Sequence, residues 1–145
     1  HKAFIGAAES GLMPKPRFIL STTLACDANT LTFRRLADHF RVPHFVLDIP
    51  YEQTEESVRD VAAQLREMKR FIEDHTGKTI DEAALRAAVA RSQRSMANFH
   101  NYMSLRADKQ ILDSLTGEMY TGFMFHNLLG SEETERYSEE CLQRC

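Results

Sequence analysis

Two short apolar runs, both bounded by proline, constrain the fold of this chain more than any other feature. Residues 17–23 follow Pro16, which forces extended backbone before them, and their β-branched side chains are typical of a buried strand. Residues 44–49 form a second such run, between Pro43 and Pro50. Continuous apolar runs of this length are expected of strands that are covered on both faces of a sheet.

The segment between the two runs has the pattern of a helix. We expect it to cover residues 30–40, with Asp27 or Asn29 as its N-terminal cap. Its apolar positions recur at helical spacing: Leu31, Phe33, Leu36, Ala37 and Phe40. A β-α-β order of this length implies a right-handed crossover between parallel strands. The sequence therefore predicts an α/β fold, a fragment of a parallel-sheet (flavodoxin-like) lobe followed by a helical region.

Two parallel strands do not form an independent sheet, because three or more strands covered on their faces are normally needed. We expect the missing strands to lie in parts of the protein outside this sequence, with a partner chain as the alternative source. The first residues, His-Lys-Ala-Phe, contain no initiator Met, which agrees with an internal start.

The predicted domains are residues 1–53, the β-α-β part that carries Cys26, and residues 54–145, a mainly helical region. The first helix expected in that region covers 55–75, capped by Thr54 and ended by Gly77. A long helix to about 106 should follow the capping-box spacing of Thr79 and Glu82. A further helix is expected over 111–128, and then an acidic segment capped by Ser131. Apolar stripes on the first two should face a core: Val58, Val61, Ala62, Leu65, Met68 and Ile72, then Leu85, Ala88, Val89, Met96, Phe99 and Met103.

The composition excludes several classes of protein. With 43% hydrophobic and 27% charged residues and a net charge of −3, the chain resembles a globular protein and not a nucleic-acid binder. No apolar run approaches the roughly 18 residues that span a membrane. Three cysteines make an odd count with lopsided spacing, which argues against a disulfide framework and favours a reducing, cytoplasmic location.

Cys26 lies where such a fold places its functional groups. In open parallel sheets, ligands bind beyond the carboxyl ends of the strands, where residues 22–27 leave the first strand and residues 48–51 leave the second. A cysteine beside a helix N-terminus is favoured as thiolate, the form that binds metal or attacks an electrophile. The alternative is that Cys26 is a small buried hydrophobe, the commonest role of a lone cysteine.

The neighbouring polar residues have structural interpretations of their own. Thr22 and Thr23 fit ordinary strand positions, and Asp48 fits a turn in which it binds a backbone amide before Pro50. Tyr51 fits a packing position on the rim.

The other metal-binding residue types show no signature. Six histidines include no His-x-x-x-His pair, so packing or solvent exposure is expected of each. Cys141 and Cys145 fall on one helical face, but two thiols do not complete a site, and an incidental tail is the simpler interpretation. Neither a phosphate-binding glycine loop nor a Gly-x-Ser-x-Gly elbow is present.

Three segments resemble one protein family. Residues 16–33 (PRFILSTTLACDANTLTF) are similar to the cysteine-containing segment of the 2-hydroxyacyl-CoA dehydratase family, which includes benzoyl-CoA reductase subunits. Residues 42–51 (VPHFVLDIPY) resemble its next strand and turn, and residues 71–85 (FIEDHTGKTIDEAAL) resemble the helical part that follows. The order and spacing of the three agree, and the likeness runs over about residues 1–130.

The resemblance implies an iron–sulfur enzyme built from two related subunits. Three cysteines per subunit hold a [4Fe–4S] cluster, and a separate ATP-dependent iron–sulfur activator protein donates one electron. A (R)-2-hydroxyacyl-CoA substrate accepts that electron, expels its hydroxyl from a ketyl radical anion, and leaves as the 2-enoyl-CoA while the electron is recycled. Such an enzyme is an oxygen-sensitive, anaerobic lyase.

Cys26 alone matches a family ligand in this sequence, and that role is not carried to Cys141 or Cys145. Thr22, Thr23, Asp27 and Asn29 are candidates for groups around the cluster. The enzyme alternative is a benzoyl-CoA reductase-type subunit. The non-enzymatic alternatives are a non-catalytic partner subunit, a helical interaction module, and an iron–sulfur electron-transfer module.

Overall fold

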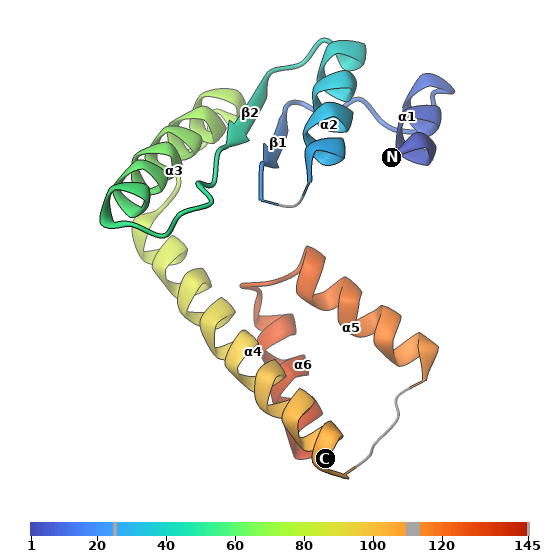
Figure 1. The fold of residues 1–145 in the computed structure, drawn as a ribbon, viewed down its shortest axis with the longest axis vertical. Helices are drawn as coiled ribbons and strands as arrows, with labels where there is room; N and C mark the ends of the chain where they lie inside the picture. The colour runs from blue at the N-terminus through green and yellow to red at the C-terminus, as the bar shows by residue number, and fades with distance from the viewer. Residues whose placement is uncertain (25, 110–113, 145) are drawn as a thin grey trace. The chain divides into compact units, whose positions relative to one another are not determined.

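The computed structural model describes residues 1–24, 26–109 and 114–144. It divides into two compact units, His1–Thr79 and Ile80–Cys145, which are described separately. Figure 1 shows the elements of both units in chain order. The first unit contains α1 (Lys2–Glu9), β1 (Ile19–Thr22), α2 (Asp27–Phe40), β2 (His44–Leu47) and α3 (Glu55–Thr76), and the second contains α4 (Glu82–Lys109), α5 (Leu115–Asn127) and α6 (Glu132–Gln143). None of the described helices is long and apolar enough to cross a bilayer.

The two strands pair in parallel, as the sequence predicts. Their register joins Ile19 to His44 and Thr22 to Leu47. One further hydrogen bond, from the N–H of Thr23 to the carbonyl of Leu47 at 3.1 Å, continues the pairing past the end of β1. The α/β class is therefore confirmed as a small parallel sheet among helices, while the flavodoxin-like order of a larger sheet stays a prediction.

Helix α2 begins three residues earlier than predicted, and the two predicted caps are wrong. The N-cap is Cys26, whose extended backbone (φ −168°, ψ 156°) precedes the first helical residue, Asp27. The carbonyl of Cys26 accepts hydrogen bonds from the N–H groups of Asn29 at 3.0 Å and Thr30 at 3.4 Å. Asp27 and Asn29 thus lie inside the first turn, where the negative charge of Asp27 suits the helix dipole.

A cluster of aromatic rings packs α3 against the sheet. The ring of Phe71 on α3 lies 5.5 Å from that of Phe18, just before β1, and 5.5 Å from that of Phe45 on β2. On the other side of β1, α2 buries Leu36 and Ala37 and also contacts α1. The short strands are therefore fixed mainly by side-chain packing from the helices beside them.

Both predicted ends of α3 are confirmed. Thr54 Oγ1 accepts a hydrogen bond from the N–H of Ser57 at 3.1 Å, and Gly77 ends the helix in the left-handed conformation (φ +69°). The predicted apolar stripe is only partly covered, since Val58 is 66% exposed and Leu65 43% exposed. Because α3 packs on β2 it belongs to the sheet-bearing unit, and the division of the whole protein at residue 53 stays a prediction.

Helix α4 begins at Glu82, and its predicted capping box is wrong. Asp81 caps the helix instead: its Oδ1 accepts from the N–H of Ala84 at 2.7 Å, and its carbonyl accepts from the N–H of Leu85 at 2.9 Å. The physical reason is position, because Thr79 lies too far before the first turn to reach its free N–H groups.

The predicted core face of α4 is confirmed only in part: Phe99 packs on Phe125, with ring centroids 4.5 Å apart, but most of the predicted stripe is exposed. Four residues of the predicted stripe are 41–49% exposed: Leu85, Val89, Met96 and Met103. The face that packs on α6 instead buries Ser95 (0% exposed) and lies one or two residues away along the helix turn. The buried Ser95 gives no apolar signal, so the apolar pattern does not mark the face that contacts α6.

The last two helices are joined by a short turn at 128–131. Ser114 caps α5 and Ser131 caps α6 by accepting from the N–H of Thr134 at 3.1 Å, so the predicted Ser131 cap is confirmed. The hydroxyl of Thr134 is fully buried and donates to the carbonyl of Leu128 at 2.8 Å. Residues 111–113, the predicted start of α5, lie outside the described residues.

Candidate functional site

The carboxyl ends of β1 and β2 are joined by a side-chain hydrogen bond. Thr23 follows β1, and its Oγ1 donates to Asp48 Oδ1, which follows β2, at 2.9 Å. The same oxygen accepts from the N–H of Ile49 at 2.9 Å. Asp48 was predicted to bind a backbone amide, and that prediction is wrong. The N–H of Ile49 is bound by the Thr23 hydroxyl, and the Asp48 carboxylate binds that hydroxyl instead.

Gln64 on α3 holds the backbone of Asp48 from the other side. Its Oε1 accepts from the N–H of Asp48 at 2.8 Å, and its Nε2 donates to the carbonyl of Asp48 at 2.9 Å. Gln64 was not among the predicted site residues. The signal was present, because a polar Gln64 stands three residues after Val61 and four before Met68 on the stripe of an otherwise apolar helix face.

Cys26 is exposed and lies where β1 turns into α2. Its side chain makes no capping hydrogen bond, so the thiol is not used to begin the helix. Before it, Thr22 Oγ1 accepts from the N–H of Leu24 at 3.2 Å and so stabilises the turn out of the strand. The interpretation of Cys26 as a buried hydrophobe is therefore wrong, whereas its functional role stays a prediction.

The remaining predicted residues lie around this turn without forming one cluster. Asp27 is exposed at the start of α2, and Asn29 is half-buried near a small hollow of about 170 Å³ beside α1. Tyr51 is 102% exposed and so packs on none of the described residues, which makes its predicted rim packing wrong. The geometry thus joins Thr23 to Asp48 and leaves Cys26 open to solvent.

The thiol of Cys26 fits the role of one ligand of an iron–sulfur cluster. A thiolate is the usual protein ligand of such clusters, and Cys26 is an exposed thiol. In the described part of the chain, no three His, Cys, Asp or Glu residues gather closely enough to hold a metal ion. Cys141 is a half-buried thiol on α6, in the other compact unit, and Cys145 lies outside the described residues.

Two of the histidines, His75 and His44, make contacts within the first unit. His75 packs on Phe71 and its Nδ1 lies 2.7 Å from that residue's carbonyl oxygen. His44 Nε2 lies 2.8 Å from Ser21 Oγ across the two strands, and partial burial, followed by the positive charge of Arg34, lowers the pKa of His44.

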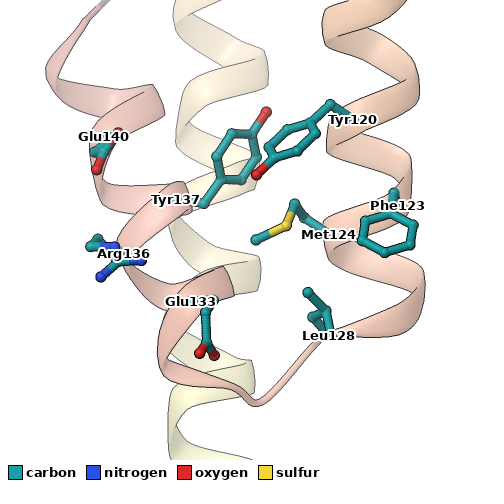
Figure 2. A pocket seen from close by; sticks show the side chains of 8 residues that line it. All are labelled: Tyr120, Phe123, Met124, Leu128, Glu133, Arg136, Tyr137 and Glu140. Atoms are coloured by element: carbon teal, nitrogen blue, oxygen red, sulfur yellow. The ribbon is translucent and has the colours of Figure 1, made fainter.

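A second hollow, of about 380 Å³, lies between α5 and α6 (Figure 2). Its lining is apolar and aromatic on one side and charged on the other: Tyr120, Phe123, Met124, Leu128, Glu133, Arg136, Tyr137 and Glu140. The hydroxyl of Tyr137 is already bonded to that of Thr121. Two carboxylates flank one guanidinium along α6, so the charges of the rim do not select a ligand of either sign.

The comparisons with known proteins identify the family. The chain matches the family described as 2-hydroxyglutaryl-CoA dehydratase, D-component, over residues 1–145. It belongs to this family. Among curated proteins, it is 26% identical over 95 residues to the (R)-phenyllactyl-CoA dehydratase alpha subunit of Clostridium sporogenes. That alignment covers 63% of this chain and 23% of the relative, so the chain matches about a quarter of the relative's length. No solved structure matches.

Proposed function

We propose that this chain is part of a dehydratase that converts a (R)-2-hydroxyacyl-CoA to the 2-enoyl-CoA with an iron–sulfur cluster. The observation that carries the proposal is the family match over residues 1–145. The relative is named as a dehydratase of (R)-phenyllactyl-CoA, a 2-hydroxyacyl thioester, and this supports the same substrate class. The small parallel sheet would be part of a larger flavodoxin-like lobe.

Cys26 would supply one thiolate to a [4Fe–4S] cluster, with the remaining ligands coming from outside the described residues. Cys26 is exposed, and its side chain makes no capping hydrogen bond. Both observations support this role, because the sulfur could bind a metal without giving up a contact at the start of the helix. A bound cluster would supply one-electron transfer to the substrate thioester, the ketyl route, at a potential tuned by nearby hydrogen-bond donors.

The residues around Cys26 have different parts in this proposal. Thr22 would keep the turn after β1 closed through its bond to the N–H of Leu24. Asp27 and Asn29, in the first turn of α2, would border the cluster. The hydroxyl of Thr23 already donates to Asp48 and accepts from the N–H of Ile49, so its part would be to hold the backbone in place.

The proposed partners are a related second subunit, an ATP-dependent iron–sulfur activator protein that donates the electron, and the acyl-CoA substrate. The relative's name, an alpha subunit, supports the second subunit. A benzoyl-CoA reductase-type subunit would share the cluster and differ in the substrate that it reduces.

The first test is the iron and acid-labile sulfide content of the full-length protein, purified without oxygen. We expect about four of each per subunit. Cys26→Ala should lose most of both. Cys141→Ala is the matched control, because it removes a half-buried thiol in the other unit and should leave both contents unchanged. A wild type without iron after reconstitution would reject the cluster and favour a non-catalytic partner subunit.

A further inference from the structure

Thr23 after β1, Asp48 after β2 and Gln64 on α3 are joined by a continuous set of hydrogen bonds at the carboxyl end of the sheet. We propose that Thr23, Asp48 and Gln64, called here the sheet-end clasp, are positioning residues that fix the backbone from which Cys26 presents its thiol. This rests on the proposed function, because it takes Cys26 as the thiol that meets the cluster.

Gln64 anchors the clasp to α3. Both ends of its side-chain amide are used, with Oε1 accepting from the N–H of Asp48 and Nε2 donating to the carbonyl of the same residue. Only one orientation of the amide satisfies both bonds. A pair of bonds exchanged with one residue is also how a neighbouring antiparallel strand would hold it. The backbone of Asp48 is therefore held by two hydrogen bonds to one side chain, although it lies past the end of β2.

Asp48 passes this restraint to Thr23. The carboxylate accepts the Thr23 hydroxyl proton at 2.9 Å, and the Thr23 oxygen accepts the N–H of Ile49 at 2.9 Å. The hydroxyl is thus fixed as donor and as acceptor, so its rotamer is determined. A third bond, from the N–H of Thr23 to the carbonyl of Leu47, holds the backbone of the same residue.

Thr23 is close enough to Cys26 for this restraint to reach it. Two residues separate them in the sequence. On the far side, the carbonyl of Cys26 accepts from the N–H groups of Asn29 and Thr30 at the start of α2. The backbone of Cys26 is therefore bounded upstream by the clasp and downstream by the helix, while its side chain is free.

The test uses four variants of the full-length protein. Thr23→Val keeps the shape and removes the hydroxyl, and Thr23→Ser restores a hydroxyl. Gln64→Ala removes the two bonds to Asp48. Gln93→Ala is the matched control, because it removes a glutamine exposed on α4, outside the clasp. The reduction potential and the EPR spectrum of the reduced cluster are measured, and hydrogen exchange of the Thr23, Leu24 and Cys26 amides is followed in protein stripped of iron.

We expect Thr23→Val and Gln64→Ala to shift the potential and change the EPR spectrum, with wild-type behaviour in Thr23→Ser and Gln93→Ala. In iron-free protein, exchange in the first two variants should be at least roughly fivefold faster, the effect of one lost hydrogen bond, because each variant removes two. A wild-type potential, spectrum and exchange rate in Thr23→Val and Gln64→Ala would overturn the clasp alone. A wild type that binds no cluster would overturn the proposed function, and the clasp's role toward the cluster with it.

Discussion

Gly130 lies against the backbone of Ala88, where the turn between α5 and α6 meets α4. A Cβ at position 130 would stand 3.2 Å from the carbonyl oxygen of Ala88, and the backbone of Gly130 has φ +94°. The carbonyl of Gly130 also accepts a hydrogen bond from Arg91 Nε at 2.7 Å. Both the conformation and the close approach therefore require glycine here.

Gly130→Ala should destabilise the second unit by about 2–3 kcal/mol, because strain at positive φ adds to the contact with Ala88. Gly77→Ala is the matched variant, with φ +69° and no atom within 4 Å of the added methyl, and should cost about 1 kcal/mol. Gly122→Ala, inside α5 with open space around it, should stabilise that helix by about 0.5–1 kcal/mol. Hydrogen exchange on the full-length protein measures all three. Equal losses at positions 77 and 130 would show that the approach to Ala88 costs nothing.

Two buried serines in the contact of α4 with α6 should respond differently to alanine. Ser95 is 0% exposed and its hydroxyl has no hydrogen-bond partner among the described residues, so Ser95→Ala should be neutral or stabilise by up to about 1 kcal/mol. Ser138 is equally buried, donates to the carbonyl of Glu135 at 2.7 Å and accepts from Asn98 Nδ2 at 3.1 Å. Ser138→Ala should therefore cost about 1–2 kcal/mol. Thermal unfolding of the two variants compares them, and a larger loss in Ser95→Ala would mean that its hydroxyl is bonded.

The sequence predicted the elements of the first unit better than the faces of the second. Proline positions and apolar runs located both strands, because those signals are local. The face of α4 was predicted only in part, because its contact with α6 uses the small side chain of Ser95, while Leu85 and Met96 of the predicted stripe are exposed. Periodicity finds an apolar stripe, but it does not report which stripe a neighbouring helix covers.

The candidate site was predictable in place but not in its contacts. The rule for parallel sheets placed Cys26 and Asp48 at one edge, and the structure agrees. The bond of Asp48 to Thr23 and its support from Gln64 depend on how α3 packs on β2, a tertiary feature that no local pattern contains.

The exposed stripes predict the behaviour of residues 1–145 expressed alone. Large apolar side chains are exposed on α3 and on α4, among them Val58 (66%) and Val89 (49%), and the sheet has two strands in the described residues. We expect a chain that self-associates or unfolds without a sharp transition, because so little apolar surface is buried. Analytical ultracentrifugation with thermal circular dichroism tests this. A monodisperse monomer with one cooperative transition would contradict it.

His44 should make the first unit more stable as pH rises through the range of histidine titration. Partial burial and the charge of Arg34 hold the pKa of His44 below the ordinary value of 6.5, against the opposing charge of Asp38. The unfolded chain therefore binds the proton more readily, so the contribution of His44 is complete above that ordinary value and is lost as pH falls through the folded pKa. His44→Gln should flatten this dependence in hydrogen exchange of the β1 and β2 amides between about pH 5 and about pH 7.5. His100→Gln, at an exposed position on α4, is the control and should keep the wild-type slope. An unchanged slope in His44→Gln would show that another group carries the dependence.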